Sequence, residues 1–316
     1  MENMVDNLIS VIMCVYNEHV NDLRLAVESI LNQSYKNFEF IILVEFDSKR
    51  ELIELVENYK EKDERVSIFY NKQKLGLPET LNLGLNYSKG EFIARMDADD
   101  VSYLDRLMIQ KDFLDSHKDV SLVSGNCVQI NESNEIIRLS NYCNDIGYHI
   151  NKIMKYGNII VHPCVMFRKK DVLELGGYRD LKAAEDYDLW LRMLSAGKKL
   201  SVIDVVLLKY RIRNESASNR NRIKLRLTSK ILSKYYKHNK VPSLKQIDKY
   251  IERYKYFSTD RLLKSYSLFN ESWIKKQNHN YFGFIKDFSF SVFLNFDVVN
   301  ILFDSILFNY YLKKSS

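Results

Sequence analysis

Apolar and polar positions alternate along the first hundred residues in the order expected for strands and helices. Four short apolar runs predict strands at 9–15, 38–44, 66–70 and 91–96. Between these runs, apolar residues recur every three or four positions, which predicts helices at 22–33, 50–62 and 77–88. A chain that alternates strands and helices forms a parallel sheet with helices on both faces, joined by right-handed connections. We therefore expect an α/β fold with a doubly wound, mostly parallel sheet.

The pattern continues less regularly beyond residue 100. Helices are predicted at 104–117 and 184–196, and strands at 120–124, 129–130 and 202–210. From about residue 215 the pattern is helical. We expect one α/β domain over residues 1–214, with halves at 1–100 and 101–214, followed by a helical C-terminal region over 215–316.

Acidic residues follow three of the four predicted N-terminal strands. Glu18 follows the first strand, Glu45 the second, and Asp97 and Asp99 the fourth. In open parallel sheets, ligands bind beyond the carboxyl ends of the strands. Carboxylates gathered there repel one another unless a cation or a polar ligand joins them. This edge of the sheet is therefore the candidate site.

Asp97, Ala98 and Asp99 form a D-x-D pattern directly after a strand. Two carboxylates spaced in this way can both turn toward one Mg²⁺ or Mn²⁺ ion, which in turn can hold a diphosphate. Solvated acidic loops are common, so the tripeptide alone is a weak signal. The chain has neither a G-x-G-x-x-G nor a G-x-x-x-x-G-K-[ST] motif, and a glycine-rich phosphate loop is not expected.

Composition narrows the class of protein. With 46% apolar and 28% charged residues, the chain is an ordinary globular one. Cys14, Cys127 and Cys164 lie among apolar residues and no C-x-x-C pair occurs, which predicts reduced thiols in a cytoplasmic protein. The first apolar run lacks the basic flank of a signal peptide, and charged residues interrupt the apolar segment 282–311, so no membrane-spanning helix is expected.

Positive charge is concentrated between Lys209 and Lys240, where eleven Lys or Arg residues accompany one acid, Glu215. The segment is either a solvated helical face or a surface for anionic lipid headgroups or a pyrophosphate-bearing acceptor. Nucleic acid is disfavoured as a partner, because no nucleic-acid-binding fold is indicated. The aromatic segment 282–311 could lie on a membrane as amphipathic helices, pack on the main domain or form a homodimer contact.

Five segments together resemble a known family. They are ISVIMCVYNE at 9–18, VESILNQSYKNFEFIIL at 27–43, SKGEFIARMDADD at 88–100, YLDRLMIQ at 103–110 and AAEDYDLWLRML at 183–194. In this order they are similar to the sequence blocks of inverting family-2 glycosyltransferases. The resemblance covers about residues 8–212. It implies the GT-A fold, a Rossmann-like, mostly parallel sheet flanked by helices.

The resemblance also implies an activity. The enzyme would transfer a hexose, with glucose or galactose favoured, from a UDP-sugar to a lipid-diphosphate-linked saccharide in the synthesis of O-antigen, capsule or another bacterial surface polysaccharide. Mn²⁺ or Mg²⁺ would be the cofactor, held by Asp99 together with Asp97. The residues that the resemblance assigns to the nucleotide sugar are Val15, Tyr16, Glu18, Glu45, Lys74, Asp97, Ala98 and Arg106. Asp186 would be the general base, with Glu185 as the alternative.

These residue types suit the reaction. Transfer with inversion needs one base for the acceptor hydroxyl and positive charge near the departing diphosphate. Each assignment has a plainer interpretation: Asp186 could cap a helix or complement its dipole, and Glu18 and Glu45 could be solvated loop acids. Lys74 and Arg106 either face the phosphates or lie on the surface.

The sequence leaves the roles of three further side chains open, those of His162, Tyr187 and Trp190. His162 is expected to be structural or to line an acceptor pocket rather than to bind metal. Tyr187 and Trp190 are either core residues or part of the acceptor wall.

The sequence departs from the family pattern in two places. Cys14 stands where a proline is common, and the segment Glu45-Phe46-Asp47 replaces a turn that usually reads Asp-Asp-Gly-Ser. The second departure leaves the identity of the donor's nucleobase undetermined. The alternatives to a UDP-sugar transferase are therefore an enzyme with a dTDP-rhamnose donor and a catalytically degenerate scaffold. A nucleotidyltransferase is disfavoured, because residues 16–21 do not form a basic, glycine-rich loop.

Overall fold

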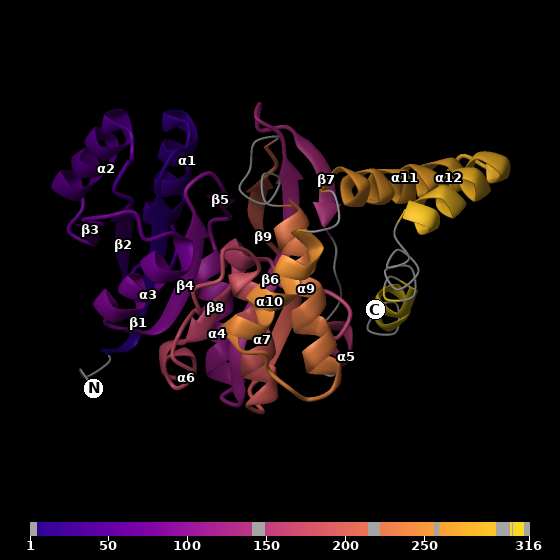
Figure 1. The fold of residues 1–316 in the computed structure, drawn as a ribbon. Helices are drawn as coiled ribbons and strands as arrows, with labels where there is room; N and C mark the ends of the chain where they lie inside the picture. The colour runs from indigo at the N-terminus through magenta and orange to yellow at the C-terminus, as the bar shows by residue number, and fades with distance from the viewer. Residues whose placement is uncertain are drawn as a thin grey trace.

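The structure of the chain is a computed structural model, which describes residues 5–140, 149–213, 222–255, 259–294, 304 and 306–312. Within these ranges one nine-stranded sheet runs through the molecule, and helices cover both of its faces (Figure 1). Cys143 and the expected domain boundary at 214/215 lie outside the described residues.

The first half of the sheet is entirely parallel. In spatial order its strands are β3 (Val66–Tyr70), β2 (Phe38–Val44), β1 (Val5–Val15) and β4 (Gly90–Asp97). The helices that join them are α1 (Val20–Leu31), α2 (Arg50–Lys62) and α3 (Leu77–Tyr87). The predicted alternation is confirmed, and the bounds of β2, β3 and α2 are the predicted ones.

Beyond β4 the sheet becomes mixed. Its remaining strands are β8 (Met166–Arg168), β6 (Val120–Ile130), β9 (Lys199–Arg211) and β5 (Val101–Ser102), and β7 (Ile136–Ser140) pairs with the free part of β6. β8 runs antiparallel to both β4 and β6, whereas β9 runs parallel to β6. The runs at 120–124 and 129–130 therefore belong to one continuous strand.

Each face of the sheet buries its own apolar core, because successive strand residues point to opposite faces. In β1, Val11 and Met13 belong to the core beneath α1, α2 and α4 (Arg106–Ser116). Ile12, between them, belongs to the opposite core. The helices over this second core are α3, α5 (Ile150–Ile153), α6 (Lys169–Leu173) and α7 (Glu185–Ser195).

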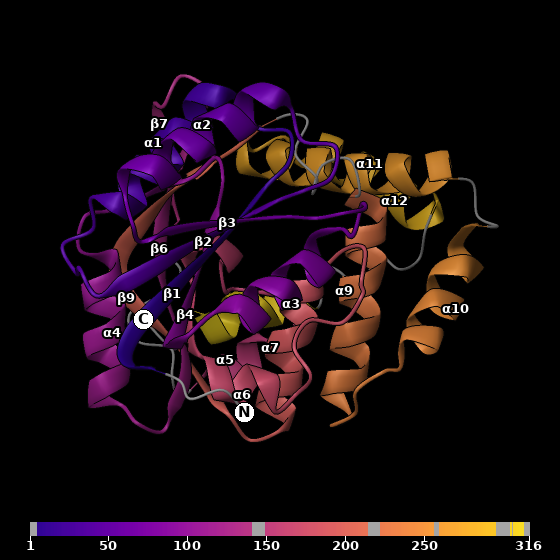
Figure 2. The same ribbon diagram turned by 90° about the vertical axis from the view of Figure 1, so that its left-hand side faces the viewer.

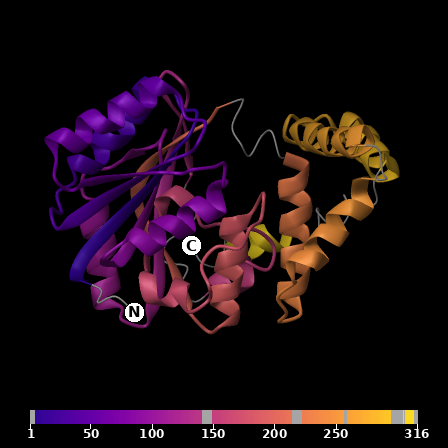
Figure 3. The same ribbon diagram turned by 60° about the vertical axis from the view of Figure 1, so that its left-hand side comes forward.

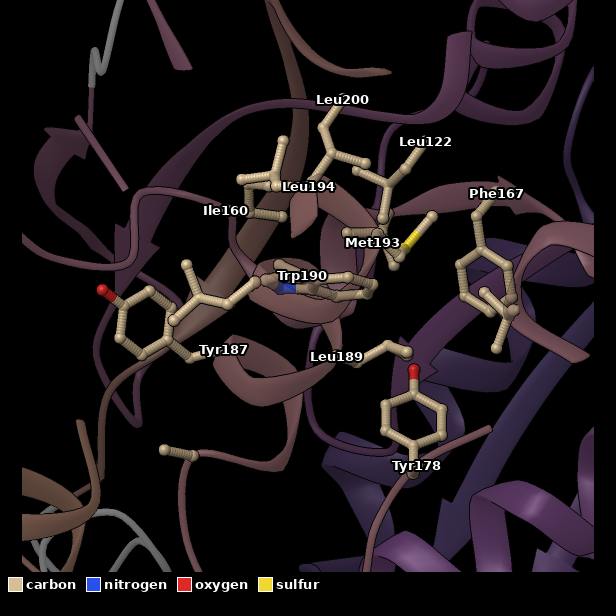
Figure 4. Close-up of a cluster of buried hydrophobic side chains, with 14 of the residues drawn as sticks. Leu122, Ile160, Phe167, Tyr178, Tyr187, Leu189, Trp190, Met193, Leu194 and Leu200 are labelled. Carbon is tan, nitrogen blue, oxygen red and sulfur yellow. The ribbon is translucent and has the colours of Figure 1, made fainter. Parts of the chain in front are cut away.

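Trp190 lies at the centre of the second core (Figure 4). Its side chain is fully buried, and Tyr187 is 1% exposed and donates its hydroxyl to the carbonyl of Met154 at 2.5 Å. Both aromatic residues are therefore core residues, and their interpretation as an acceptor wall is wrong. Truncating a buried aromatic side chain of this size costs about 3–5 kcal/mol of folding free energy.

The C-terminal region is helical, as predicted. Its helices are α9 (Arg222–Lys237), α10 (Leu244–Lys255), α11 (Thr259–Gln277) and α12 (Tyr281–Leu294). α9 lies against α7 and α10 lies beside α9, where Ile231 and Ile247 join the second core (Figure 2 and Figure 3). Within the described residues, no helix is long and apolar enough to cross a membrane.

Candidate active site

The carboxyl ends of β1, β2 and β4 meet at one edge of the sheet. In the parallel register, Val15 pairs with Val44 and Cys14 pairs with Asp97. The residues that follow these strands therefore share one edge, as the sequence predicted.

Three aspartates form a cluster at the end of β4. One carboxylate oxygen from each of Asp97, Asp99 and Asp100 lies within 4.8 Å of the others. Burial and, next, the charge of Asp97 raise the pKa of Asp99 to about 7. Burial also raises the pKa of Asp100 well above its usual value. Carboxylates crowded in this way need added positive charge to be ionised together.

Asp100 was not singled out by the sequence. It is fully buried, and its Oδ1 accepts a hydrogen bond from the backbone N–H of Arg211 at 2.8 Å. Its Oδ2 is buried and has no hydrogen-bond partner among the described residues. A buried oxygen left in this state beside two further carboxylates fits a hard divalent cation such as Mg²⁺ or Mn²⁺.

Arg95 supplies a buried positive charge beneath this cluster. Its Nη2 lies 2.5 Å from Oδ1 of Asp97, and its side chain is 5% exposed. Burial alone would lower the pKa of Arg95, but the charge and hydrogen bond of Asp97 keep that pKa above its ordinary value. No sequence motif marks Arg95, because it occupies a buried position within β4.

Two more arginines reach the cluster from the end of β9. Nε of Arg213 lies 3.1 Å from Oδ2 of Asp99, and Nη2 of Arg213 lies 2.8 Å from Oδ2 of Asp22. Nε of Arg211 donates to the backbone carbonyl of Asp99 at 2.8 Å. The start of the basic segment 209–240 thus folds onto the acidic cluster, and the solvated-face interpretation is wrong for these two residues.

Tyr16 and Lys74 form a pair on the outer side of the site. Nζ of Lys74 donates to the Tyr16 hydroxyl at 2.9 Å and lies 4.8 Å from the centre of its ring. The backbone N–H of Tyr16 donates to Oε2 of Glu18 at 2.9 Å. Burial raises the pKa of Glu18 in spite of this bond, so Glu18 is not an ordinary solvated acid. Tyr16 is 39% exposed and its ring is available to a ligand.

Two of the expected nucleotide residues, Val15 and Ala98, have buried side chains. Val15 is 1% exposed, and its carbonyl accepts hydrogen bonds from the backbone N–H of Glu45 at 2.9 Å and from the Ser48 hydroxyl at 3.1 Å. Ala98 is 3% exposed. Their side chains shape the floor of the site, and only their backbone groups could bind polar atoms.

Glu45 holds the amino end of α3. Its carboxylate accepts backbone N–H groups from Gly76 at 3.0 Å and Leu75 at 3.3 Å, and the Asn71 amide at 3.2 Å. Burial would raise the pKa of Glu45, but these bonds, together with one from the backbone N–H of Phe46 at 3.0 Å, outweigh it and lower that pKa. Gly76 has a φ of 83°, which favours glycine, and it offers no side chain to cap α3. The interpretation of Glu45 as a solvated loop acid is therefore wrong.

Arg106 does not belong to the expected nucleotide site. Its side chain is fully buried and does not lie on the surface. Its Nη2 donates to the carbonyl of Arg95 at 2.7 Å, its Nη1 to the Ser102 hydroxyl at 3.0 Å and its Nε to Gln110 at 3.1 Å. With its donors used inside the core, Arg106 braces the strand beneath the aspartates and does not face a nucleotide.

Glu185 and Asp186 form the first turn of α7. Burial and the charge of Asp186 raise the pKa of Glu185 to about 7. Burial also raises the pKa of Asp186, although the Tyr187 N–H, the charge of Arg95 and the Asn158 amide act in the opposite direction. Nδ2 of Asn158 donates to Oδ2 of Asp186 at 2.9 Å. The N-cap position belongs to Ala184, so neither acid occupies it.

The start of α7 is fixed from two sides. Ala184 has a φ of 60° and a ψ of 30°, a left-handed conformation that a non-glycine residue adopts only under constraint. One turn further, the buried carboxylate of Asp188 pairs with the guanidinium groups of Arg179 and Arg192. These pairs hold the helix while its first turn presents the two acids.

His162 lies in the core behind the site. Its Nε2 is 3.0 Å from the hydroxyl of Tyr178, and its ring meets Trp190 edge to face. Burial and the charge of Arg95 lower the pKa of His162 well below its usual value. The ring is therefore neutral, and the expectation that it is structural fits these contacts.

Comparison with known proteins gives consistent matches. A model of the family described as Glycosyl transferase family 2 matches residues 10–176. The chain is 37% identical over 214 residues to the O-antigen biosynthesis glycosyltransferase WbnJ of Escherichia coli, covering 66% of this chain and 82% of that protein. It is 30% identical over 239 residues to a UDP-Gal:alpha-D-GlcNAc-diphosphoundecaprenol beta-1,3-galactosyltransferase of Escherichia coli, covering 72% of this chain and 82% of that protein.

A solved structure shares the fold. S. aureus TarS 1-349 in complex with UDP-GlcNAc superposes with a TM-score of 0.61 at 17% sequence identity, covering 97% of this chain and 87% of that chain. At this identity the similarity is one of fold, and it extends through the C-terminal helices.

Proposed function

The chain belongs to glycosyl transferase family 2, and we propose that it transfers a hexose from a UDP-sugar to a lipid-diphosphate-linked saccharide, with inversion at the anomeric carbon. It is a glycosyltransferase of polysaccharide biosynthesis and binds a nucleotide-sugar donor. Galactose is the favoured hexose because one relative is named for UDP-Gal and a diphosphoundecaprenol acceptor, and glucose is the alternative. The proposal places the enzyme in the cytoplasm, as the cysteine pattern predicted.

The observation that carries the proposal is the buried charge of Arg95, which acts on two acidic groups. Its guanidinium pairs with Asp97, and its charge opposes the rise that burial causes in the pKa values of Glu185 and Asp186. The charge of Asp97 also acts on Glu185, and these interactions support a single site that holds the aspartate cluster and the acid pair. A donor-side cluster and an acceptor-side base are the two parts that a single displacement needs.

Asp186 is the proposed base. It accepts the proton of the acceptor hydroxyl as that oxygen bonds to the anomeric carbon, while the bond from this carbon to the diphosphate oxygen breaks and UDP departs. A carboxylate whose pKa is raised is a stronger base than an ordinary aspartate. Asn158 fixes the orientation of its carboxylate by donating to Oδ2. Glu185, one residue away, is the alternative base.

Asp99 and Asp97 would hold the divalent cation, with the buried Oδ2 of Asp100 turned to the same cluster. When bound, Mn²⁺ or Mg²⁺ supplies positive charge that offsets the charge of the departing diphosphate. Arg213 brings a further positive charge to Asp99 from the end of β9.

The nucleoside would lie on the outer side of the cluster. Tyr16 offers an exposed ring, with Lys74 at its hydroxyl and Val15 and Glu18 beside it. Glu45 acts on this pocket through its hold on α3, and a direct contact with uridine would compete with its bonds to Leu75 and Gly76.

A transfer assay tests the proposal. The protein is incubated with Mn²⁺, a lipid-diphosphate-linked saccharide and either UDP-galactose, UDP-glucose or dTDP-rhamnose, and the product linkage is determined by NMR. A β-linked hexose product that D186N fails to form supports the proposal. Transfer from dTDP-rhamnose alone overturns the donor assignment, and an α-linked product from UDP-galactose or UDP-glucose overturns the inverting mechanism.

A further inference from the structure

Helix α12 is apolar on two sides. Its inner side packs against α11, where Phe284 lies 5.9 Å from the ring of Trp273 and Phe288 lies 6.2 Å from the ring of Phe269. On this side the hydroxyl of Ser265 donates to the carbonyl of Ser291 at 2.9 Å. These contacts pack Phe284 and Phe288 against α11.

Four other large apolar residues of α12 face outward. We call these residues the outer face of α12: Phe282, Ile285, Phe290 and Phe293. Phe282 is 83% exposed and Ile285 is 61% exposed. They fall on one side of the helix, because a helix turns by about 100° per residue. Proteins in water rarely leave several large apolar side chains together in solvent without a binding partner.

Two lysines lie at the outer face. Lys286 lies within it and is exposed, and Nζ of Lys264 lies 5.9 Å from the ring of Phe290. Asp287, the acid of α12 next to this face, is buried, and its charge is paired with Lys275. Aromatic side chains among lysines are typical of helices that lie in the interface of an anionic membrane.

The hairpin of α11 and α12 projects beyond the sheet (Figure 1 and Figure 3). α9, which precedes α10 and the hairpin in the chain, and residues 306–312, which follow the hairpin, both contact residues 155–158. The Ser233 hydroxyl of α9 donates to the carbonyl of Lys155 at 2.6 Å, and Tyr311 stacks on Tyr156 at 5.9 Å. The same short segment ends at Asn158, which holds Asp186. The hairpin is therefore linked to the acceptor side of the site.

From this geometry we infer that the outer face of α12 rests in the interface of an anionic lipid bilayer. The inference deepens the proposed function, since a lipid-linked acceptor would reach Asp186 from the same membrane. The lysines contact the headgroups while the aromatic rings and Ile285 leave water.

Vesicle flotation of the full chain tests the inference. Vesicles of phosphatidylcholine with 30% phosphatidylglycerol are compared with phosphatidylcholine alone, at low and high salt. We expect the protein to float with the anionic vesicles and to be released by salt. The variant F282S/I285S should bind about 100-fold more weakly, because each side chain contributes roughly a factor of ten or more when buried.

The matched control is I136S/I137S, which replaces two other exposed apolar residues, 64% and 56% exposed on β7. It should float like the natural protein. A natural protein that stays at the bottom with both vesicle types overturns the inference, and so does an F282S/I285S variant that still floats. A light-scattering mass of twice 37.4 kDa that this variant halves, without flotation, would assign the outer face to a second copy of the chain and also overturn it.

These outcomes are separate from the proposed function. UDP-dependent thermal stabilisation of both variants reports whether the donor site is intact. Flotation without any nucleotide effect would contradict the donor assignment alone, and a nucleotide effect without flotation would contradict the membrane inference alone.

Discussion

Nη2 of Arg95 lies 2.5 Å from Oδ1 of Asp97, deep beneath the edge of the sheet. Nη1 of the same guanidinium is buried and has no hydrogen-bond partner among the described residues. Burying a charge of this kind costs folding free energy unless opposite charges compensate it. Here it pairs with Asp97 of the aspartate cluster, and its charge also acts on Glu185 and Asp186.

Replacing Arg95 should shift the pH profile of the reaction. The positive charge of Arg95 lowers the pKa values of Glu185 and Asp186, so its removal raises them. A base with a higher pKa is protonated at higher pH, and the acid limb of kcat/KM should therefore move to higher pH in R95M. R95K, which keeps the charge, should move it less. An unchanged limb in a folded R95M protein would show that Arg95 does not act on the base.

Substitutions of Asp186 and of Glu185 should have different effects on turnover. D186N should keep donor affinity and lose turnover by about 10²–10⁴-fold, the range for removal of a general base. E185Q should lose much less. Because the charge of Asp186 helps to raise the pKa of Glu185 to about 7, D186N should also lower that pKa, which carboxyl-resolved NMR can follow. The reverse order of activities would make Glu185 the base.

Glu45 should stabilise the fold only when ionised. Its pKa is lowered in the folded protein, so its contribution is present above its unfolded pKa of about 4.3 and is lost as the pH falls through the folded value. E45Q should reduce the free energy of unfolding by about 1–3 kcal/mol at pH 7, because buried N–H groups lose a charged acceptor.

Urea unfolding at pH 7 and pH 3 measures this difference. The gap between the natural protein and E45Q should shrink at pH 3. E54Q is the control, because Glu54 pairs with Arg50 on the surface and its change should stay within about 0.5 kcal/mol. A gap of equal size at both pH values would rule out the ionised carboxylate as the cause.

Asp99 should destabilise the metal-free protein at high pH. Its pKa is raised to about 7, so the folded state binds its proton more tightly and stability falls as the pH rises from about 4 toward 7. At pH 8 with EDTA, D99N should melt at or above the natural protein. Addition of Mn²⁺ should raise the melting temperature of the natural protein and not that of D99N.

D47N is the matched control for this experiment, since Asp47 is an exposed acid near the same edge of the sheet. It should keep the response to Mn²⁺. A response that persists in D99N would remove Asp99 from the metal site.

The sequence was sufficient for elements whose pattern repeats locally. The alternation of 38–44, 50–62 and 66–70 predicted β2, α2 and β3 at their observed bounds, because each presents an apolar face of regular period. β8 was missed, since three residues carry no period. Its antiparallel course makes the second half of the sheet mixed.

The sequence could not reveal side chains that meet across long separations. Arg213 contacts Asp99, and the backbone N–H of Arg211 meets Asp100, although more than a hundred residues lie between them. Arg106 was expected at the surface or at the phosphates. The carbonyl and hydroxyl groups that accept its hydrogen bonds come from Arg95 in β4 and Ser102 in β5, and no local sequence pattern indicates these contacts.

The most direct test of the central claim is a thermal-shift panel with UDP, GDP, dTDP and CMP, each with and without Mn²⁺. A ligand at about 100 times its dissociation constant adds roughly 2.7 kcal/mol to the free energy of unfolding. The account predicts stabilisation by UDP that depends on Mn²⁺ and disappears in D99N. Stabilisation by another nucleotide alone, or by none of the four, would contradict it.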